Sequence, residues 1–247
     1  MIRVWVLLFW LAGCASTSAP LPEPSFDEPE TLNRASSLAG NLAGLNLSLT
    51  PFTHMGGSVS PVRAELLAAE QRYLPYLLKT TLTESGFWGA VRVTPGVDVT
   101  AELNCQGQLL SASAAALQLR LICRDALGRS WLDDRFDTRI ARDTYGQAAV
   151  DGPDPYRPIM VRIANRLADG LTRLTDQDRQ RLRDAALLRY AQSLSPEGFD
   201  GYLAINAEGE MQVQGLPASS DPMIARVRRI RDSEYQFIDA MDEQYRL

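Results

Sequence analysis

The sequence has 247 residues, 45% of them hydrophobic and 22% charged, which is typical of a globular chain long enough for one large or two small domains. Its 30 acidic residues outnumber its 25 basic ones, so no nucleic-acid footprint is visible and nucleic acid is not an expected partner. His54 is the single histidine and Lys79 the single lysine, which excludes histidine pairs for metal binding and leaves one candidate each for imidazole and amine catalysis.

The chain begins with the pattern of a signal peptide. Arg3 supplies a positive charge, residues 4–11 form a short apolar run, and residues 11–14 read Leu-Ala-Gly-Cys. The run is too short to span a bilayer, which requires about 20 apolar residues. We therefore predict a signal peptide over residues 1–13, with an ordinary secretory signal followed by a chance cysteine as the alternative.

The Leu-Ala-Gly-Cys ending resembles the lipobox of bacterial lipoproteins. In that family the signal is removed before the cysteine, whose sulfur is diacylated and whose new amino group is acylated. The resemblance implies that Cys14 is lipidated and anchors the chain in a membrane. The residue after Cys14 is Ala15 and not an aspartate. By the same resemblance, the absence of aspartate at this position implies sorting to the outer membrane, with the anchored body facing the periplasm.

A proline-rich acidic tether follows the lipidated cysteine and completes segment 14–31. Residues 15–31 contain four prolines and four acidic residues, and they lack the apolar side chains that would offset the entropy of ordering. We interpret the segment as a spacer between membrane and body. A partner-binding peptide is the alternative, because proline-rich strings are also recognition motifs.

The body begins with a strand, a helix and a second strand. Residues 45–50 alternate apolar and polar side chains up to Pro51, which predicts a half-buried strand. A helical pattern starts near Pro61, and because an internal proline removes a helical hydrogen bond, we expect Pro75 to break it into two pieces. The second piece ends at Gly86, a left-handed cap, and residues 91–94 form the next strand.

A β-hairpin is the clearest passage of the sequence. Apolar or small residues occupy the odd positions of 99–109 and again of 117–123, which gives each strand one buried face. Folding the two strands about Ala114 pairs residues whose numbers sum to a constant, and this register places Cys105 opposite Cys123. Directly opposed side chains are close enough for a bridge, and the envelope outside the inner membrane is oxidising. We predict a disulfide between them; two reduced thiols in one core are the alternative.

The rest of the chain predicts one more strand, three helices and a small hairpin. A strand over 131–140 precedes helices over 158–174 and 176–194, a hairpin of 202–206 with 211–214, and a last helix over 222–245. The predicted fold class is therefore α/β (α+β). Its core is a small mixed sheet with a three-stranded antiparallel meander packed by helices, and a helix–hairpin–helix segment follows.

The order of elements in the body is similar to a known family. A first strand, a leucine-rich helix ending in Ser85-Gly86-Phe87-Trp88, the strand at 91–93 and the later meander resemble the amino-terminal domain of TolB. Related domains occur in the curli secretion lipoprotein and the penicillin-binding-protein activators. The resemblance implies a binding and assembly domain over 32–175 with no catalytic residues, and it has no counterpart for the helical segment with a hairpin at 176–247.

Two charged clusters have structural as well as functional interpretations. Asp133, Asp134 and Asp137 would suggest a cation site, but alternation sends Asp134 to the opposite face and Arg135 shares the face of the other two. We therefore expect a salt-bridged strand, with no metal site and no cofactor. The last helix carries a basic run that is either a solvated face or a contact to an anionic ligand. The run consists of Arg226, Arg228, Arg229 and Arg231.

Together these patterns predict a non-enzymatic outer-membrane lipoprotein that binds another envelope protein or complex. The alternative is a binder of lipopolysaccharide or peptidoglycan that uses the basic last helix. No catalytic constellation is recognisable in the sequence, and His54, beside Met55 and a Gly-Gly pair, is expected in an exposed loop.

Overall fold

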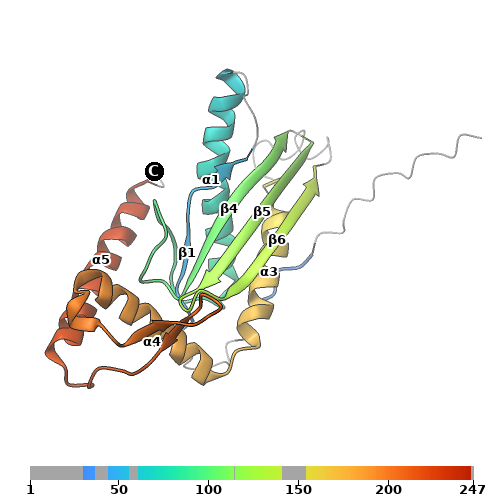
Figure 1. Ribbon diagram of the computed structural model, residues 1–247. Helices are drawn as coiled ribbons and strands as arrows, with labels where there is room; N and C mark the ends of the chain where they lie inside the picture. The colour runs from blue at the N-terminus through green and yellow to red at the C-terminus, as the bar shows by residue number, and fades with distance from the viewer. Residues whose placement is uncertain (1–29, 37–43, 56–60, 114, 141–153, 246–247) are drawn as a thin grey trace, which may run out of the picture.

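The computed structural model describes residues 30–36, 44–55, 61–113, 115–140 and 154–245 (Figure 1). Its helices are α1 (Pro61–Ser85), α3 (Arg157–Thr172), α4 (Asp176–Leu194) and α5 (Pro222–Tyr245), with a 3-10 turn at Glu197–Phe199. Its strands are β1 (Leu47–Leu49), β2 (Thr53–His54), β3 (Val91–Val93), β4 (Leu103–Ser113), β5 (Ala116–Asp125), β6 (Ser130–Arg139), β7 (Leu203–Ile205) and β8 (Met211–Val213). Cys14 and the predicted signal peptide lie outside the described residues.

A mixed sheet forms the centre of the body and confirms the predicted fold class. Its strand order is β3-β1-β4-β5-β6, with β1 parallel to both β3 and β4. Strand β2 is also parallel to β4 and pairs with it farther along the edge that β1 occupies. Strands β4, β5 and β6 form the expected antiparallel meander. Figure 1 shows α1 and α3 behind the sheet, and leucines from both helices and from the sheet, such as Leu78, Leu167 and Leu119, form one core cluster.

Pro75 does not break the first helix, so that prediction was wrong. Helix α1 is continuous, with Pro75 inside it. Proline lacks the N–H that would bond the carbonyl oxygen of Gln71, four residues earlier. The backbone N–H of Phe52 donates to that oxygen at 2.9 Å instead. The unused acceptor therefore docks the segment between β1 and β2 onto the helix, and the helix continues because its orphan carbonyl is satisfied.

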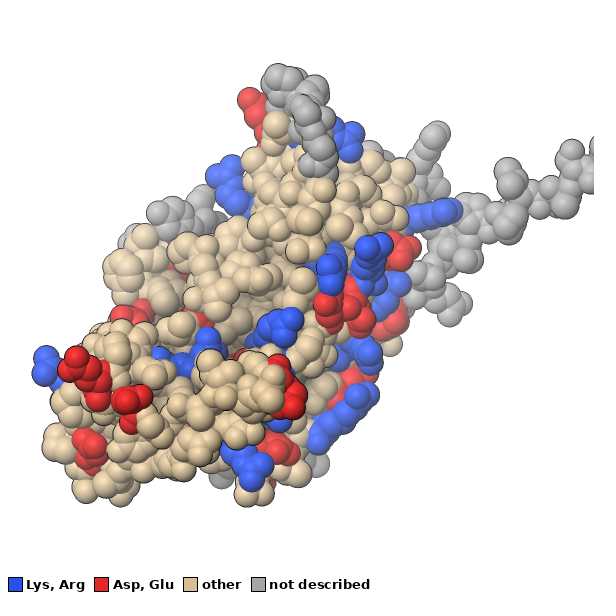
Figure 2. Space-filling view, viewed as in Figure 1, with Lys and Arg blue, Asp and Glu red and all other residues tan. Residues whose placement is uncertain are grey.

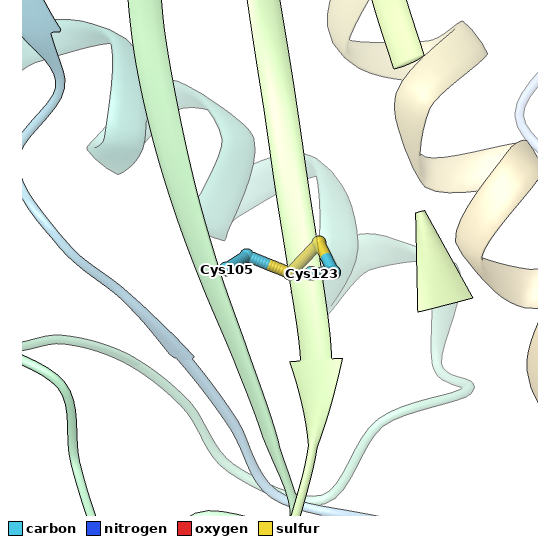
Figure 3. The surroundings of a disulfide bond; sticks show 2 residues. All are labelled: Cys105 and Cys123. Atoms are coloured by element: carbon cyan, nitrogen blue, oxygen red, sulfur yellow. A yellow bond between two sulfur atoms is a disulfide. The ribbon is translucent and has the colours of Figure 1, made fainter. Parts of the chain in front are cut away.

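The β4–β5 hairpin has the predicted register over most of its length. Cys105 pairs with Cys123 across a Cα–Cα distance of 4.1 Å, and the two are joined by a disulfide (Figure 3). Beyond Leu109 the register shifts by one residue, so that Ser113 pairs with Ala116, and the single register expected up to the turn was wrong. An extra residue in one strand is a β-bulge, which alternation of the two flanking segments does not reveal.

Strand β4 begins at Leu103, four residues later than residue 99 of the prediction. Asp98 accounts for the difference, because its carboxylate accepts hydrogen bonds from the N–H and O–H of Thr100. The side chain of Asn104 in turn bonds the backbone N–H and carbonyl of Asp98. Such side-chain bonds to nearby backbone form a turn in place of a strand ladder.

The C-terminal segment has the predicted helix–hairpin–helix order. A reciprocal pair of hydrogen bonds between Thr175 and Asp178 caps the start of α4. Helix α4 contributes Leu182 to the main core and Leu188 to a second cluster, which also contains Val227 of α5. None of the helices in the described part of the chain is both long and apolar enough to cross a membrane.

Candidate interaction site

A groove of about 1150 Å³ lies between α1, the end of β3 and the second half of α5. Most of its lining is apolar or aromatic. The lining residues are Pro51, Ala69, Arg72, Tyr73, Tyr76, Leu77, Thr80, Val93, Thr94, Pro95, Phe237, Ile238, Met241 and Asp242. Large concave sites with apolar walls and a few polar groups are where proteins usually bind ligands or partner segments.

Two aromatic side chains stand exposed on opposite walls of the groove. Tyr73 of α1 is 46% exposed and Phe237 of α5 is 67% exposed. The hydroxyl of Tyr73 bonds the carboxylate of Asp154, and burial followed by the effect of Asp154 raises the pKa of Tyr73 to about 12. At neutral pH Tyr73 is therefore an uncharged aromatic surface that is held in place at one end.

A buried arginine, Arg92, attaches α5, which forms one wall of the groove, to the sheet. Arg92 lies between Val91 and Val93 in β3, so alternation sends its side chain to the face opposite the one that packs on α1. Its guanidinium makes two hydrogen bonds to the carboxylate of Asp239, at 2.7 and 2.8 Å. The central carbon of the guanidinium group also lies 3.9 Å from the ring centroid of Tyr235. A bidentate ion pair and a cation–π contact together compensate a cation that is nearly removed from water.

Lys79 of α1 makes a second ion pair with α5. The ammonium group of this single lysine contacts the carboxylate of Asp242, and both side chains are largely buried. The two carboxylates of α5 therefore meet cations from two different elements of the body. The second half of α5 is held by charges, whereas Ile224 and Val227 in its first half are buried in an apolar cluster.

Tyr235 and Glu102 complete the polar layer under α5. The hydroxyl of Tyr235 donates to the carbonyl of Thr100 at 3.0 Å, and burial raises its pKa to about 12. The carboxylate of Glu102 accepts from the N–H of Asn46 at 2.6 Å. Burial also raises the pKa of Glu102, against the lowering effect of that hydrogen bond and of the nearby Arg231. A buried carboxylate in this layer makes it sensitive to pH.

The four arginines predicted as an anionic-ligand contact differ in their exposure. Arg226, Arg228 and Arg229 are exposed, and Arg226 and Arg229, three residues apart, lie on the same side of α5. Arg231 is half-buried, with its guanidinium carbon 5.9 Å from the ring centroid of Tyr235. Arg231 thus belongs to the layer between α5 and the body.

The three aspartates of β6 are separated as alternation predicted. Asp133 makes two hydrogen bonds to Arg120 of β5, at 2.6 and 2.8 Å, whereas Asp134 faces α3 and lies 3.6 Å from Arg166. In the part of the chain that the structure describes, no group of three or more metal-ligating side chains is placed to hold an ion. His54 lies in strand β2 and is half-buried, rather than in the exposed loop expected for it.

Sequence reasoning missed the residues that form and hold the groove. Arg92 and Lys79 each interrupt an apolar pattern, and a lone cation at such a position is a signal for a buried ion pair. Nothing in the sequence points to their partners, because Asp239 lies 147 residues from Arg92 and Asp242 lies 163 residues from Lys79.

No family model and no curated protein matches the chain. Several solved structures, including the following two, share a weak similarity with it. The hypothetical protein CT253 from Chlamydia trachomatis is 11% identical, with a TM-score of 0.33 over 53% of this chain and 94% of that one. A PelC dodecamer from Paraburkholderia phytofirmans is 10% identical, with a TM-score of 0.36 over 56% of this chain and 94% of PelC. Similarity at this level does not bear on function.

Proposed function

We propose that this chain is an outer-membrane lipoprotein that binds another envelope protein through the groove between α1 and α5 and catalyses no reaction. The Leu-Ala-Gly-Cys ending at Cys14 supports the anchor, and the order of strands and helices supports a TolB-like binding domain. The observation that carries the proposed activity is the groove itself, with the exposed rings of Tyr73 and Phe237 on its two walls.

The chemistry of the groove favours an apolar segment of a protein as its ligand. Aromatic residues that stand at a concave surface are the typical anchors of protein interfaces. Few charged side chains line the groove, and the carboxylate of Asp242 is already paired with Lys79. An anionic glycan or lipid headgroup would find little to neutralise its charge there, whereas leucine or aromatic side chains of a partner would bury against Leu77, Ile238 and Met241.

A photo-crosslinking amino acid at position 237 tests this function in intact envelopes. We expect a discrete adduct with one envelope protein, identified by mass spectrometry, and loss of that adduct when Tyr73 on the opposite wall is changed to Ser. The matched control places the same crosslinker at Ile205 of β7, which is 72% exposed but lies outside the groove.

The outcomes separate the proposal from its alternative. An adduct that forms equally well from position 205 is not specific to the groove and would overturn the proposal. Lipopolysaccharide or peptidoglycan that stays bound to the wild type and is lost when Arg228 and Arg229 are reversed to Glu would favour the glycan- or lipid-binding alternative. Binding of that kind depends on exposed charges and therefore also weakens strongly with salt. Capture of the partner protein should survive those two reversals.

A further inference from the structure

In the part of the chain that the structure describes, strand β6 is an edge of the sheet. Within the described residues, β5 is the one strand that pairs with it. The N–H of Ile140 bonds the carbonyl of Ala115, so even-numbered residues direct their backbone groups toward β5. Odd-numbered residues from 133 to 139 therefore direct theirs outward, which agrees with the hydrogen bond of Arg162 to the carbonyl of Asp137 at 2.7 Å.

The same odd-numbered residues carry charges of alternating sign. Asp133, Arg135, Asp137 and Arg139 are all exposed, and alternation places them on the face of the sheet opposite α3. Figure 2 shows basic and acidic side chains interspersed on the side of the molecule where β5 and β6 lie in Figure 1. Charges on an edge strand usually keep other strands away, but an alternating row repels some partners and attracts others.

A second copy of the same strand is complementary to this row in one antiparallel register. With Phe136 on a two-fold axis, Asp133 faces Arg139 of the other copy and Arg135 faces Asp137, so all four outward residues meet an opposite charge. Shifting the axis to residue 135 places Arg135 against itself and Asp133 against Asp137. Shifting it to residue 137 places Asp137 against itself and Arg135 against Arg139. Like charges directly opposite each other destabilise a strand pair.

The backbone agrees with this register. The residues that direct N–H and carbonyl groups outward are the odd-numbered ones, and the register about Phe136 pairs odd residues with odd residues, as hydrogen-bonded pairs require. At the opposite edge of the sheet, the side chain of Arg92 in β3 contacts Tyr235 and Asp239 of α5. Arg162 occupies one outward carbonyl of β6, which the partner's N–H would take over.

We propose that two copies of this chain pair through β6, antiparallel about a two-fold axis at Phe136, so that the meanders of both copies form one continuous sheet. The interface is isologous: each opposite-charge pair occurs twice, and any substitution acts twice. It lies on the β6 edge, away from the groove between α1 and α5, so dimer formation does not depend on the function proposed for that groove.

Charge exchange within β6 tests the interface and its register. The full chain, extracted with its anchor, is measured by sedimentation equilibrium in density-matched detergent, where we expect a reversible dimer. Arg135→Asp and Asp137→Arg each create two like-charge pairs, and each should raise the dimer dissociation constant about tenfold. The double variant exchanges the two charges, restores opposite signs in both pairs, and should return the dissociation constant close to that of the wild type.

Two matched controls have the same change of charge away from the strand. Arg181→Asp, at an exposed position of α4, and Glu208→Arg, in the β7–β8 turn, should leave the dimer unaffected. A chain that is monomeric at every concentration would show that the charges of β6 protect an unpaired edge. An oligomer that none of the β6 variants weakens, or a folded double variant that fails to regain the dimer, would equally overturn the proposed register.

Discussion

The ring of Phe52 lies directly against the backbone of Gly107. A Cβ atom added at position 107 would lie 2.3 Å from Cδ1 and from Cε1 of that ring, far inside van der Waals contact. Phe52 is almost completely buried, and its N–H is the group that bonds the free carbonyl of Gln71 in α1. One residue between β1 and β2 thus joins the helix layer to β4, and it requires a glycine in that strand.

Substituting Gly107→Ala should therefore destabilise the protein. Overpacking a full core costs about 1–3 kcal/mol, measured as the free energy of unfolding in urea. Adding Phe52→Leu to that variant should recover part of the loss, because a smaller side chain gives room to the new methyl group. Gly215→Ala is the control, since nothing lies within 4 Å of a Cβ atom there. Equal stability of the two alanine variants would contradict the contact.

Substituting Asp239→Asn should loosen the second half of α5. The change removes the charge that compensates buried Arg92, and because Asp239 is itself half exposed, we expect a loss of about 1–2 kcal/mol. Hydrogen exchange should become faster in residues 232–245 and stay unchanged in α4. Asp232→Asn is the matched control on the same helix, because Asp232 is exposed and its ion pair with Arg231 is long, at 3.9 Å. Uniform exchange changes in both variants would refute the attachment.

Stability should depend on pH through Glu102. Burial raises the pKa of this carboxyl in the folded protein above its ordinary value of 4.5. As the pH rises from 4.5, the unfolded state therefore loses the proton first, while the folded state still holds it. The folded state binds more protons in that window, and its stability therefore falls as pH increases through the raised pKa. Glu102→Gln resembles the protonated form and should gain stability relative to the wild type at neutral pH. If the free energies of unfolding of the wild type and of Glu102→Gln differ by the same amount at every pH from about 4 upward, this effect is excluded.

Removing the disulfide should destabilise the meander. The bridge joins residues 18 positions apart, and closing a loop of that size stabilises by about 3 kcal/mol on the chain-entropy model. The double variant Cys105→Ala, Cys123→Ala should lose that amount, measured in urea without reductant. Alkylation of two thiols in unreduced protein isolated from the envelope would show that the bridge does not form there.

Cys14→Ser should abolish acylation and membrane retention of the chain. The prediction follows from the Leu-Ala-Gly-Cys ending of the apolar run. Intact mass shows the lipid, and fractionation shows where each form is found. A serine variant that remains in the membrane fraction, together with a wild type that carries no lipid mass, would contradict the anchor.

Local periodicity was sufficient to predict most elements of the fold. Alternation over two short segments placed Cys105 opposite Cys123, and the spacing of apolar residues gave the bounds of α4 and α5 as the structure has them. These features depend on residues that are neighbours in the sequence, and the period of a strand or helix is a property of the backbone alone. A one-residue bulge after Leu109 leaves both flanking patterns intact, so it stayed invisible.

The sequence by itself determined the class of fold, the order of its elements and the cysteine pair, because each is encoded in the spacing of nearby residues. Tertiary structure alone decided that α1 continues through Pro75, since the compensating donor, Phe52, comes from another element. It also decided that α5 closes over β3, because Arg92 and Asp239 are ordinary charges until the fold brings them within 2.7 Å of each other. Local patterns show which side chains must be buried, whereas the partners of buried charges are set by contacts between residues far apart in the chain.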